Sequence, residues 1–255
     1  MRFFDKLIIK LFFILFLIIN INFVTAQDQE ENLNVLDRWV EWSNAGNLLD
    51  LHLYRQACNY LDMREAEIEC LKTKSDWQKR QYYVKKLFME IVGPFHERTP
   101  LNPQITGIIK KNDYTIEKII FESMPNYHVT GCLFIPDDII EKRPAILFVS
   151  GHSRMAFRRD AYQQVIHNLV KKGFIVFAID PMGQGERMQY TDEEKKKNGL
   201  YGKSPTHEHS YANNQCLLSG SSVARYWIWD GMRAIDYLIS RKEVDADRIG
   251  VTGLS

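Results

Sequence analysis

The stretch Val251-Thr252-Gly253-Leu254-Ser255 decides the fold, because it combines an apolar strand with a turn that presents a serine. Residues 245–252 indicate a turn that leads into this strand, and they follow a long helical pattern. In this setting a strand can break sharply and expose a nucleophilic serine, and glycine is expected beside it because the strained turn leaves little room for side chains. The alternative is a strand end followed by a surface turn, and Gly253-Leu254-Ser255 alone does not separate the two.

The composition is that of an ordinary globular protein with one large domain. The chain has 255 residues, of which 45% are hydrophobic and 25% are charged. Its 33 basic and 32 acidic side chains leave a formal charge of +1. Because this balance provides no basic field for a phosphate backbone, we expect no binding to nucleic acid.

The N-terminus has the pattern of an export signal, because Arg2, Lys6 and Lys10 precede an apolar run over 11–19. Small residues end at Ala26, so we expect a signal peptide over 1–26 and an exported protein, secreted or periplasmic. The alternative is an uncleaved anchor, but this run is shorter than the roughly 20 residues that a spanning helix needs. We therefore expect no stable membrane span after cleavage.

Four cysteines are too few and too scattered for a disulfide scaffold, although export would permit a bridge. We expect buried free thiols at Cys58, Cys70, Cys132 and Cys216. Cys58 and Cys70 are the only pair close in sequence, and no Cys-x-x-Cys metal spacing occurs.

Residues 27–95 are predicted to form a helical N-terminal cap region whose apolar residues pack in a core. The clearest helix is predicted to start at Ser75, with Ser75 and Gln78 as a capping box, and to stop at Gly93-Pro94.

Strand patterns follow a proline-bearing linker. Residues 114–121 and 128–135 flank Ser123-Met124-Pro125-Asn126 and predict an antiparallel hairpin. Two nearly pure apolar runs, 145–149 and 174–179, predict central parallel strands, since strands with one solvated face would alternate. Apolar residues at helical spacing between these runs predict the crossover helix of a βαβ unit.

Residues 183–219 show weak periodicity and are predicted to form a long loop over the sheet's C-terminal edge. The charge run 192–197 within it is interpreted as a solvated face. A helix is then expected from Ser221, leading to the strand that ends at Gly253. The residues predicted to point inward from this helix are Val223, Trp227, Ala234, Ile235, Leu238 and Ile239.

Two loops at the ends of the predicted parallel strands carry polar residues. Ser150-Gly151-His152-Ser153 could supply backbone N–H groups that stabilise an oxyanion, or it could be a loop whose His152 satisfies its own hydrogen bonds. In the second loop, Gly183 and Gly185 lack the third glycine of a dinucleotide motif, where Met188 stands. We expect Gln184, Glu186 and Arg187 to form a wall of the site, with Glu186 and Arg187 paired.

His207-Glu208-His209 has the spacing of one arm of a metal site. Two histidines two residues apart without a third ligand are more often loop residues, so no metal is expected.

Several ordered motifs between residues 75 and 255 together resemble those of the acetylxylan-esterase-related carbohydrate esterases among the α/β-hydrolases. They are Tyr114-Thr115-Ile116-Glu117, Glu122-Ser123-Met124-Pro125, Val129-Thr130-Gly131, Gly151-His152-Ser153, the loop 180–187, Trp229-Asp230-Gly231-Met232-Arg233-Ala234 and the stretch 244–253. The resemblance implies an α/β-hydrolase domain over 104–255 with a mostly parallel sheet. It further implies a secreted serine esterase that acts on acetyl or methyl esters of polysaccharides. Ser255 would be the nucleophile, and the loop at His152 and Ser153 would provide backbone oxyanion donors.

The same resemblance places the triad acid, the histidine and the remaining strands after Ser255. We therefore expect an N-terminal portion of a longer protein, incomplete at its C-terminus and inactive by itself. Acyl transfer by a serine needs no metal or organic cofactor. The alternatives are a peptidase or thioesterase of the same fold, or a catalytically dead carbohydrate-binding relative. The expected partner is a polysaccharide or oligosaccharide ester, and the sequence leaves the oligomeric state open.

Overall fold

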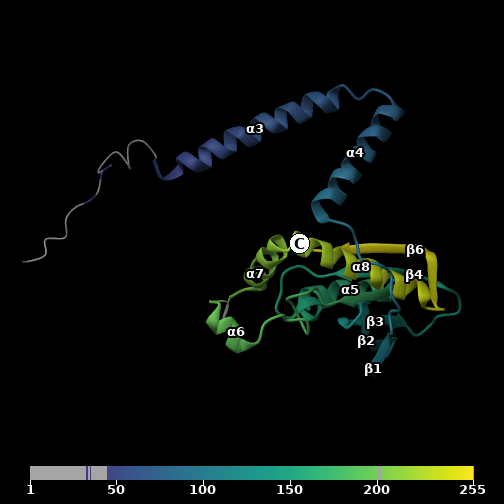
Figure 1. The fold of residues 1–255 in the computed structure, drawn as a ribbon. Coiled ribbons are helices and arrows are strands. Elements are labelled where there is room, and N and C mark those ends of the chain that lie inside the picture. Colours follow the sequence, from purple (N-terminus) through teal and green to yellow (C-terminus); the bar gives the residue numbers. More distant parts are fainter. Residues whose placement is uncertain (1–32, 34, 36–44, 200–202, 255) are drawn as a thin grey trace, which may run out of the picture. The chain divides into compact units, whose positions relative to one another are not determined.

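The computed structural model describes Leu33, Val35, residues 45–199 and residues 203–254 (Figure 1). The expected signal peptide, the first part of the predicted cap region and Ser255 lie outside the described residues. The chain divides into two compact units, Met1–Trp77 and Gln78–Ser255. In the described part of the chain, no helix is long and apolar enough to cross a membrane.

Helices dominate the described residues before the sheet, as predicted. They are the short 3-10 helix η1 Ala45–Asn47, α3 Leu48–Glu69 and α4 Lys74–Val92. The prediction of core packing is wrong for α4, where only Val92 is buried, and for α3, which buries none of its residues. Its apolar side chains are scattered around the helix rather than gathered on one face, so they form no continuous apolar stripe. Their role as a cap stays a prediction.

The start of α4 differs from the prediction by one residue and by its capping residues. Thr73 and Asp76 form the reciprocal cap in place of Ser75 and Gln78. The Thr73 N–H donates to Asp76 Oδ2 at 2.9 Å, and the Asp76 N–H donates to Thr73 Oγ1 at 3.2 Å. In a capping box, a side chain in the first turn accepts a hydrogen bond from the backbone N–H of the N-cap residue. The short Asp76 carboxylate does this for the Thr73 N–H. The helix ends at Val92, before Gly93 with φ of +90°, as predicted.

A mixed six-stranded sheet with the order β1-β2-β3-β5-β4-β6 forms the centre of the second unit. The strands are β1 Gln104–Lys110, β2 Tyr114–Met124, β3 Tyr127–Pro136, β4 Arg143–Val149, β5 Ile175–Ile179 and β6 Val244–Gly253. The hairpin β2–β3 is antiparallel, and β4 is parallel to both β5 and β6. These pairings confirm the predicted hairpin and crossover. The unpredicted β1 is an edge strand with mostly exposed side chains, so it lacks an alternating apolar pattern.

Helices cover both faces of this sheet. On one face, Ala234, Tyr237 and Leu238 of α8 Val223–Ser240 pack against apolar residues of β2 to β5. On the other face, α5 Asp160–Lys171 packs against β3, β4 and β5, and the 3-10 helix η2 Ala156–Arg158 precedes it. All residues of β5 are buried between these layers, as its unbroken apolar run predicts.

One inward residue predicted for α8 is wrong, because the Ile239 side chain is 50% exposed. It lies one residue after Leu238, which is fully buried, so it points to a different side of the helix. The polar residues Asp230 and Arg233 of α8 are buried instead.

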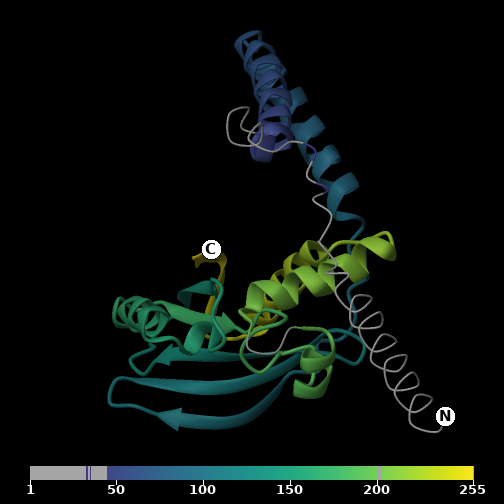
Figure 2. The same ribbon diagram turned by 90° about the vertical axis from the view of Figure 1, so that its left-hand side faces the viewer.

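Residues 183–219 are partly helical, so the prediction of a long loop is wrong. They contain α6 Asp192–Lys197, capped by Thr191 and Glu194, and α7 Pro205–Leu218, which lies alongside α8 (Figure 2). Periodicity did not reveal α7 because its apolar residues are few and do not form a stripe. The charge run on α6 has no buried residue, as predicted, but Lys195 Nζ lies 3.4 Å from the carboxylate of buried Glu208.

The four cysteines are free, as predicted. Only the expectation of burial is wrong, because Cys70 is exposed and the other three are half-buried. Cys70 follows the last residue of α3, a helix that buries nothing.

Candidate active site

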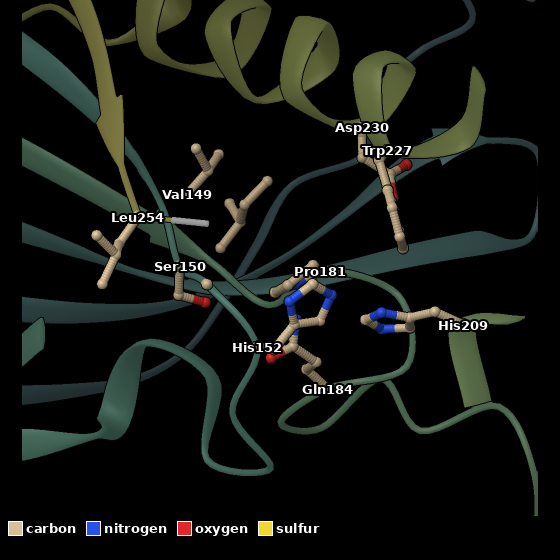
Figure 3. A pocket seen from close by; sticks show the side chains of 11 residues that line it. Val149, Ser150, His152, Pro181, Gln184, His209, Trp227, Asp230 and Leu254 are labelled. Atoms are coloured by element: carbon tan, nitrogen blue, oxygen red, sulfur yellow. The ribbon is translucent and has the colours of Figure 1, made fainter. Parts of the chain in front are cut away.

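A cavity of about 200 Å³ lies where β4, β5 and β6 end. Parallel neighbours place their carboxyl ends at one edge of a sheet, which is where α/β proteins bind ligands. Val149 of β4, Ile179 of β5 and Leu254 after β6 line it, with His152, His209 and Asp230 from other segments. Figure 3 shows the imidazole rings of His152 and His209 next to each other, with Leu254 at the opposite end.

The end of β6 lies against β4 at Gly253. A Cβ atom added to Gly253 would lie 2.0 Å from the carbonyl oxygen of Val149. The close approach of the two strands therefore requires glycine, which agrees with the steric reason given for glycine in this turn. Leu254 then borders the cavity. Ser255, the predicted nucleophile, is the next residue and lies outside the described residues, so its role stays a prediction.

The loop after β4 brings Ser150, Gly151 and His152 to the cavity. The Ser153 N–H donates to Gln184 Oε1 at 2.5 Å, so this predicted oxyanion donor already has an acceptor. The His152 N–H has no hydrogen-bond partner among the residues that the structure describes. Of the two predicted donors, His152 is therefore the one with a free N–H group.

Buried Asp180 organises the loop after β5. Its carboxylate accepts hydrogen bonds from Thr130 Oγ1 at 2.9 Å and from Arg158 Nη1 at 2.7 Å. A Cβ atom on Gly185, whose φ is +59°, would lie 2.2 Å from Asp180 Oδ1. The glycine thus lets the backbone turn tightly over a carboxylate, and the interpretation as a structural loop holds.

Gly183 has a similar role on the cavity side of this loop. Its φ is +82°, and an added Cβ would lie 2.6 Å from Cδ2 of His209. Only glycine combines this left-handed conformation with so close a neighbour. Gly183 therefore fixes how closely the loop packs against the His209 ring.

The predicted pairing of Glu186 with Arg187 is wrong. Glu186 is exposed and lies 3.5 Å from Arg158 Nη2. Arg187 is buried and donates from Nη1 to Asp230 Oδ2 at 2.7 Å. Consecutive residues of this loop point to opposite sides, so only Arg187 reaches the carboxylate on α8. Of the three residues predicted to form a wall of the site, Gln184 is buried and borders the cavity.

Asp230 is the acid of this buried ion pair and also borders the cavity. Its Oδ1 accepts a hydrogen bond from Ser123 Oγ at 2.6 Å. Burial raises the pKa of Asp230, whereas Arg187 and the Ser123 hydroxyl oppose that rise. Arg187 and Ser123 therefore stabilise the carboxylate in an otherwise unfavourable environment.

His209 lines the cavity, whereas the sequence suggested only a loop residue or one arm of a metal site. His209 is only 6% exposed, and its ring packs edge-on against Trp227 at 4.8 Å between centroids. Among the described residues, neither ring nitrogen of His209 has a hydrogen-bond partner of good geometry, although the Met182 backbone raises the pKa of His209 slightly. Burial and the neighbouring His152 ring nevertheless lower the pKa of His209 to about 4.

The residues around His209 point in different directions. His207 Nδ1 bonds to Ser204 Oγ at 3.0 Å on the surface, and Glu208 accepts from the Gln189 N–H at 2.6 Å. In the described part of the chain, no three His, Cys, Asp or Glu residues gather as metal ligands would. The spacing of histidines two residues apart on a helix could not reveal that one of them enters a cavity.

The sequence profile of the Abhydrolase family matches residues 61–255 of this chain. The chain belongs to this family.

Two relatives illustrate how far the likeness of this Abhydrolase family member extends. A curated protein of Bacillus subtilis (strain 168), named "Putative hydrolase YtaP", is 23% identical over 181 residues, which are 67% of this chain and 55% of that protein. The structure of "a putative acetyl xylan esterase (BF1801) from Bacteroides fragilis NCTC 9343" matches with a TM-score of 0.56 and 21% identity, over 72% of this chain and 49% of that one.

A third relative, "Methylesterase BT1017", matches with a TM-score of 0.55 and 22% identity, over 77% of this chain and 39% of that one. The chain thus spans about half the length of the relatives it matches. The two structures show that this Abhydrolase family member has the α/β-hydrolase fold, as the sequence motifs implied.

Proposed function

We propose that this protein is an exported serine esterase that removes acetyl or methyl groups from polysaccharide esters. One observation carries the proposal: Leu254, which directly follows β6, lines the same cavity as Ser150, Gly151 and His152. Ser255, the proposed nucleophile, is the next residue in the sequence. The structures named "a putative acetyl xylan esterase" and "Methylesterase BT1017" share the fold, which supports ester chemistry on carbohydrates.

In the proposed reaction, a histidine base takes the proton from Ser255 Oγ while that oxygen attacks the ester carbonyl carbon. The His152 N–H stabilises the oxyanion of the tetrahedral intermediate. The C–O bond to the alcohol then breaks, and the histidine returns the proton to the leaving oxygen. Water, activated by the same base, hydrolyses the acyl-serine and releases the acid. In α/β-hydrolases the acid and the histidine follow the nucleophile in chain order.

Replacement of Ser255 tests the nucleophile. In the full-length protein, we expect Ser255→Ala to lower turnover of p-nitrophenyl acetate by about a thousandfold or more, because only binding and oxyanion stabilisation would remain. Ser210→Ala is the matched control, since Ser210 is an exposed serine of α7 whose hydroxyl bonds to its own helix. Wild-type turnover in Ser255→Ala would exclude the assignment.

A substrate panel separates the proposal from its alternatives. Acetylated xylan, methyl-esterified pectin, acyl-thioesters and peptides would be compared at equal concentration, and the sugar esters are expected to react fastest. A preference for peptides or thioesters would favour a peptidase or thioesterase of the same fold, and no turnover of any ester would favour a catalytically dead relative.

Export is proposed from the N-terminal pattern, and sequencing the N-terminus of the mature protein tests it. Gln27 is expected as the first residue, because the small residues of the signal end at Ala26. A mature protein that still begins at Met1 would contradict this expectation.

A further inference from the structure

A second cavity, of about 400 Å³, lies between the loop after β5 and the helices α7 and α8. Its aromatic lining consists of Tyr127, Tyr190 and Tyr226, and its polar rim includes Gln189 and Gln215. None of the described residues that line it carries a charge at neutral pH. Its volume is in the range of ligand sites, which is about 300–1,000 Å³.

The same three segments of the chain line this cavity and the candidate active site. On α7, His209 borders the first cavity, and Ala212, about one turn later, borders the second. On α8, Trp227 and Tyr226 border the first and the second cavity respectively. In the loop after β5 the corresponding pair is Pro181 and Met182. A chain-like substrate that enters the first cavity therefore has the second cavity as its neighbour.

The polar groups of the rim leave both a donor and an acceptor for a ligand. Gln189 Nε2 donates to the carbonyl of Arg187 at 2.7 Å, which leaves its Oε1 as an acceptor. Gln215 Oε1 accepts a long hydrogen bond from Tyr190 at 3.4 Å, which leaves its Nε2 as a donor. Burial raises the pKa of Tyr127 to about 12, so its hydroxyl stays neutral and donates to Met182 Sδ.

We propose that this second cavity binds a neutral sugar ring next to the esterified one, an inference that rests on the proposed function. Aromatic rings match the apolar C–H faces of a pyranose, and amide groups match hydroxyls that both donate and accept. None of the described residues that line this cavity has a cation to pair with a free uronate carboxylate, and burying an unpaired charge is costly. The Arg187 guanidinium, 5.2 Å from the centroid of the Tyr127 ring, already pairs with Asp230.

The double variant Tyr190→Ala/Gln215→Ala tests the cavity, and Asn214→Ala is the matched control because Asn214 is an exposed neighbour on α7 that does not line it. In the full-length protein with an acetylated xylo-oligosaccharide, we expect kcat/KM of the double variant to fall about tenfold, mainly through KM, as the loss of one or two net contacts implies. Turnover of p-nitrophenyl acetate should change less than twofold, since that substrate has no second ring. Tyr190→Phe/Gln215→Ala keeps the aromatic ring at position 190. A smaller loss of kcat/KM in this variant than in the double alanine variant would show that stacking on the ring contributes.

A binding measurement separates failure of this inference from failure of the proposed function. Calorimetry with Ser255→Ala would compare a neutral xylo-oligosaccharide with an oligogalacturonate, before and after the double substitution. If the neutral oligosaccharide binds and the double substitution abolishes that binding, the inference about the cavity is supported even if the wild type hydrolyses no sugar ester. Unchanged oligosaccharide turnover and binding in the double variant would overturn it while leaving the esterase proposal intact. Tighter binding of the oligogalacturonate, or no binding of either ligand, would also overturn it.

Discussion

Gly253 lies so close to Val149 that a single added methyl group would meet the Val149 carbonyl oxygen at 2.0 Å. The obstacle is backbone, so it cannot rotate away as a flexible side chain could. The register of β6 against β4, in which Val149 pairs with Gly253, therefore depends on a glycine at the point where the chain enters the candidate active site.

We predict that Gly253→Ala destabilises the protein by about 1–3 kcal/mol or more, because the overlap forces β6 away from β4. Gly250→Ala is the matched control on the same strand, where an added Cβ meets no atom within 4 Å. Its effect should stay within about 0.5 kcal/mol. Urea unfolding of both variants measures the difference, and equal midpoints would show that the strand end can shift without cost.

The buried pair of Arg187 and Asp230 provides a second prediction. Asp230→Asn leaves the Arg187 guanidinium buried without a counterion, which should cost about 3–5 kcal/mol. The exposed pair of Asp245 and Arg248, at 2.6 Å, is the control. Asp245→Asn should cost far less, because solvent screens this pair. Chemical denaturation compares the two, and a similar small cost in both variants would contradict the buried role of Arg187.

His209 provides a prediction about pH. Its folded-state pKa of about 4 lies below the ordinary 6.5, so between these values the unfolded chain binds a proton that the folded chain does not. The stability contributed by this site should therefore fall as the pH drops from 6.5 toward 4 and stay constant above 6.5. His209→Gln removes this dependence. The nearby titrating groups are His152 and Asp230.

Proton NMR of the His209 ring, assigned by its loss in His209→Gln, measures the pKa directly. A titration near 6.5 would show that solvent or a hydrogen-bond partner reaches the ring. In that case the difference in unfolding free energy between wild type and His209→Gln would not vary over this pH range.

The strand patterns of the sequence were sufficient to predict the central strands of the sheet. Residues 145–149 and 174–179 are apolar throughout because helices cover both faces of β4 and β5, and this burial is visible in the residue types themselves. The hairpin β2–β3 and the glycine at the end of β6 were predicted for similarly local reasons. By contrast, β1 and α7 carry no apolar stripe, so periodicity could not predict them.

By itself, the sequence determined the order of the strands from β2 to β6, the family resemblance and the position of Ser255 after a strand, because each depends on neighbours along the chain. Only the tertiary structure decided the partners of the polar residues. Arg187 pairs with Asp230, 43 residues away, rather than with adjacent Glu186, and His209 joins His152 across 57 positions of sequence. The physical reason is that burial makes an unpaired charge or polar group costly, so the folded chain selects partners by proximity in space and not by spacing in sequence.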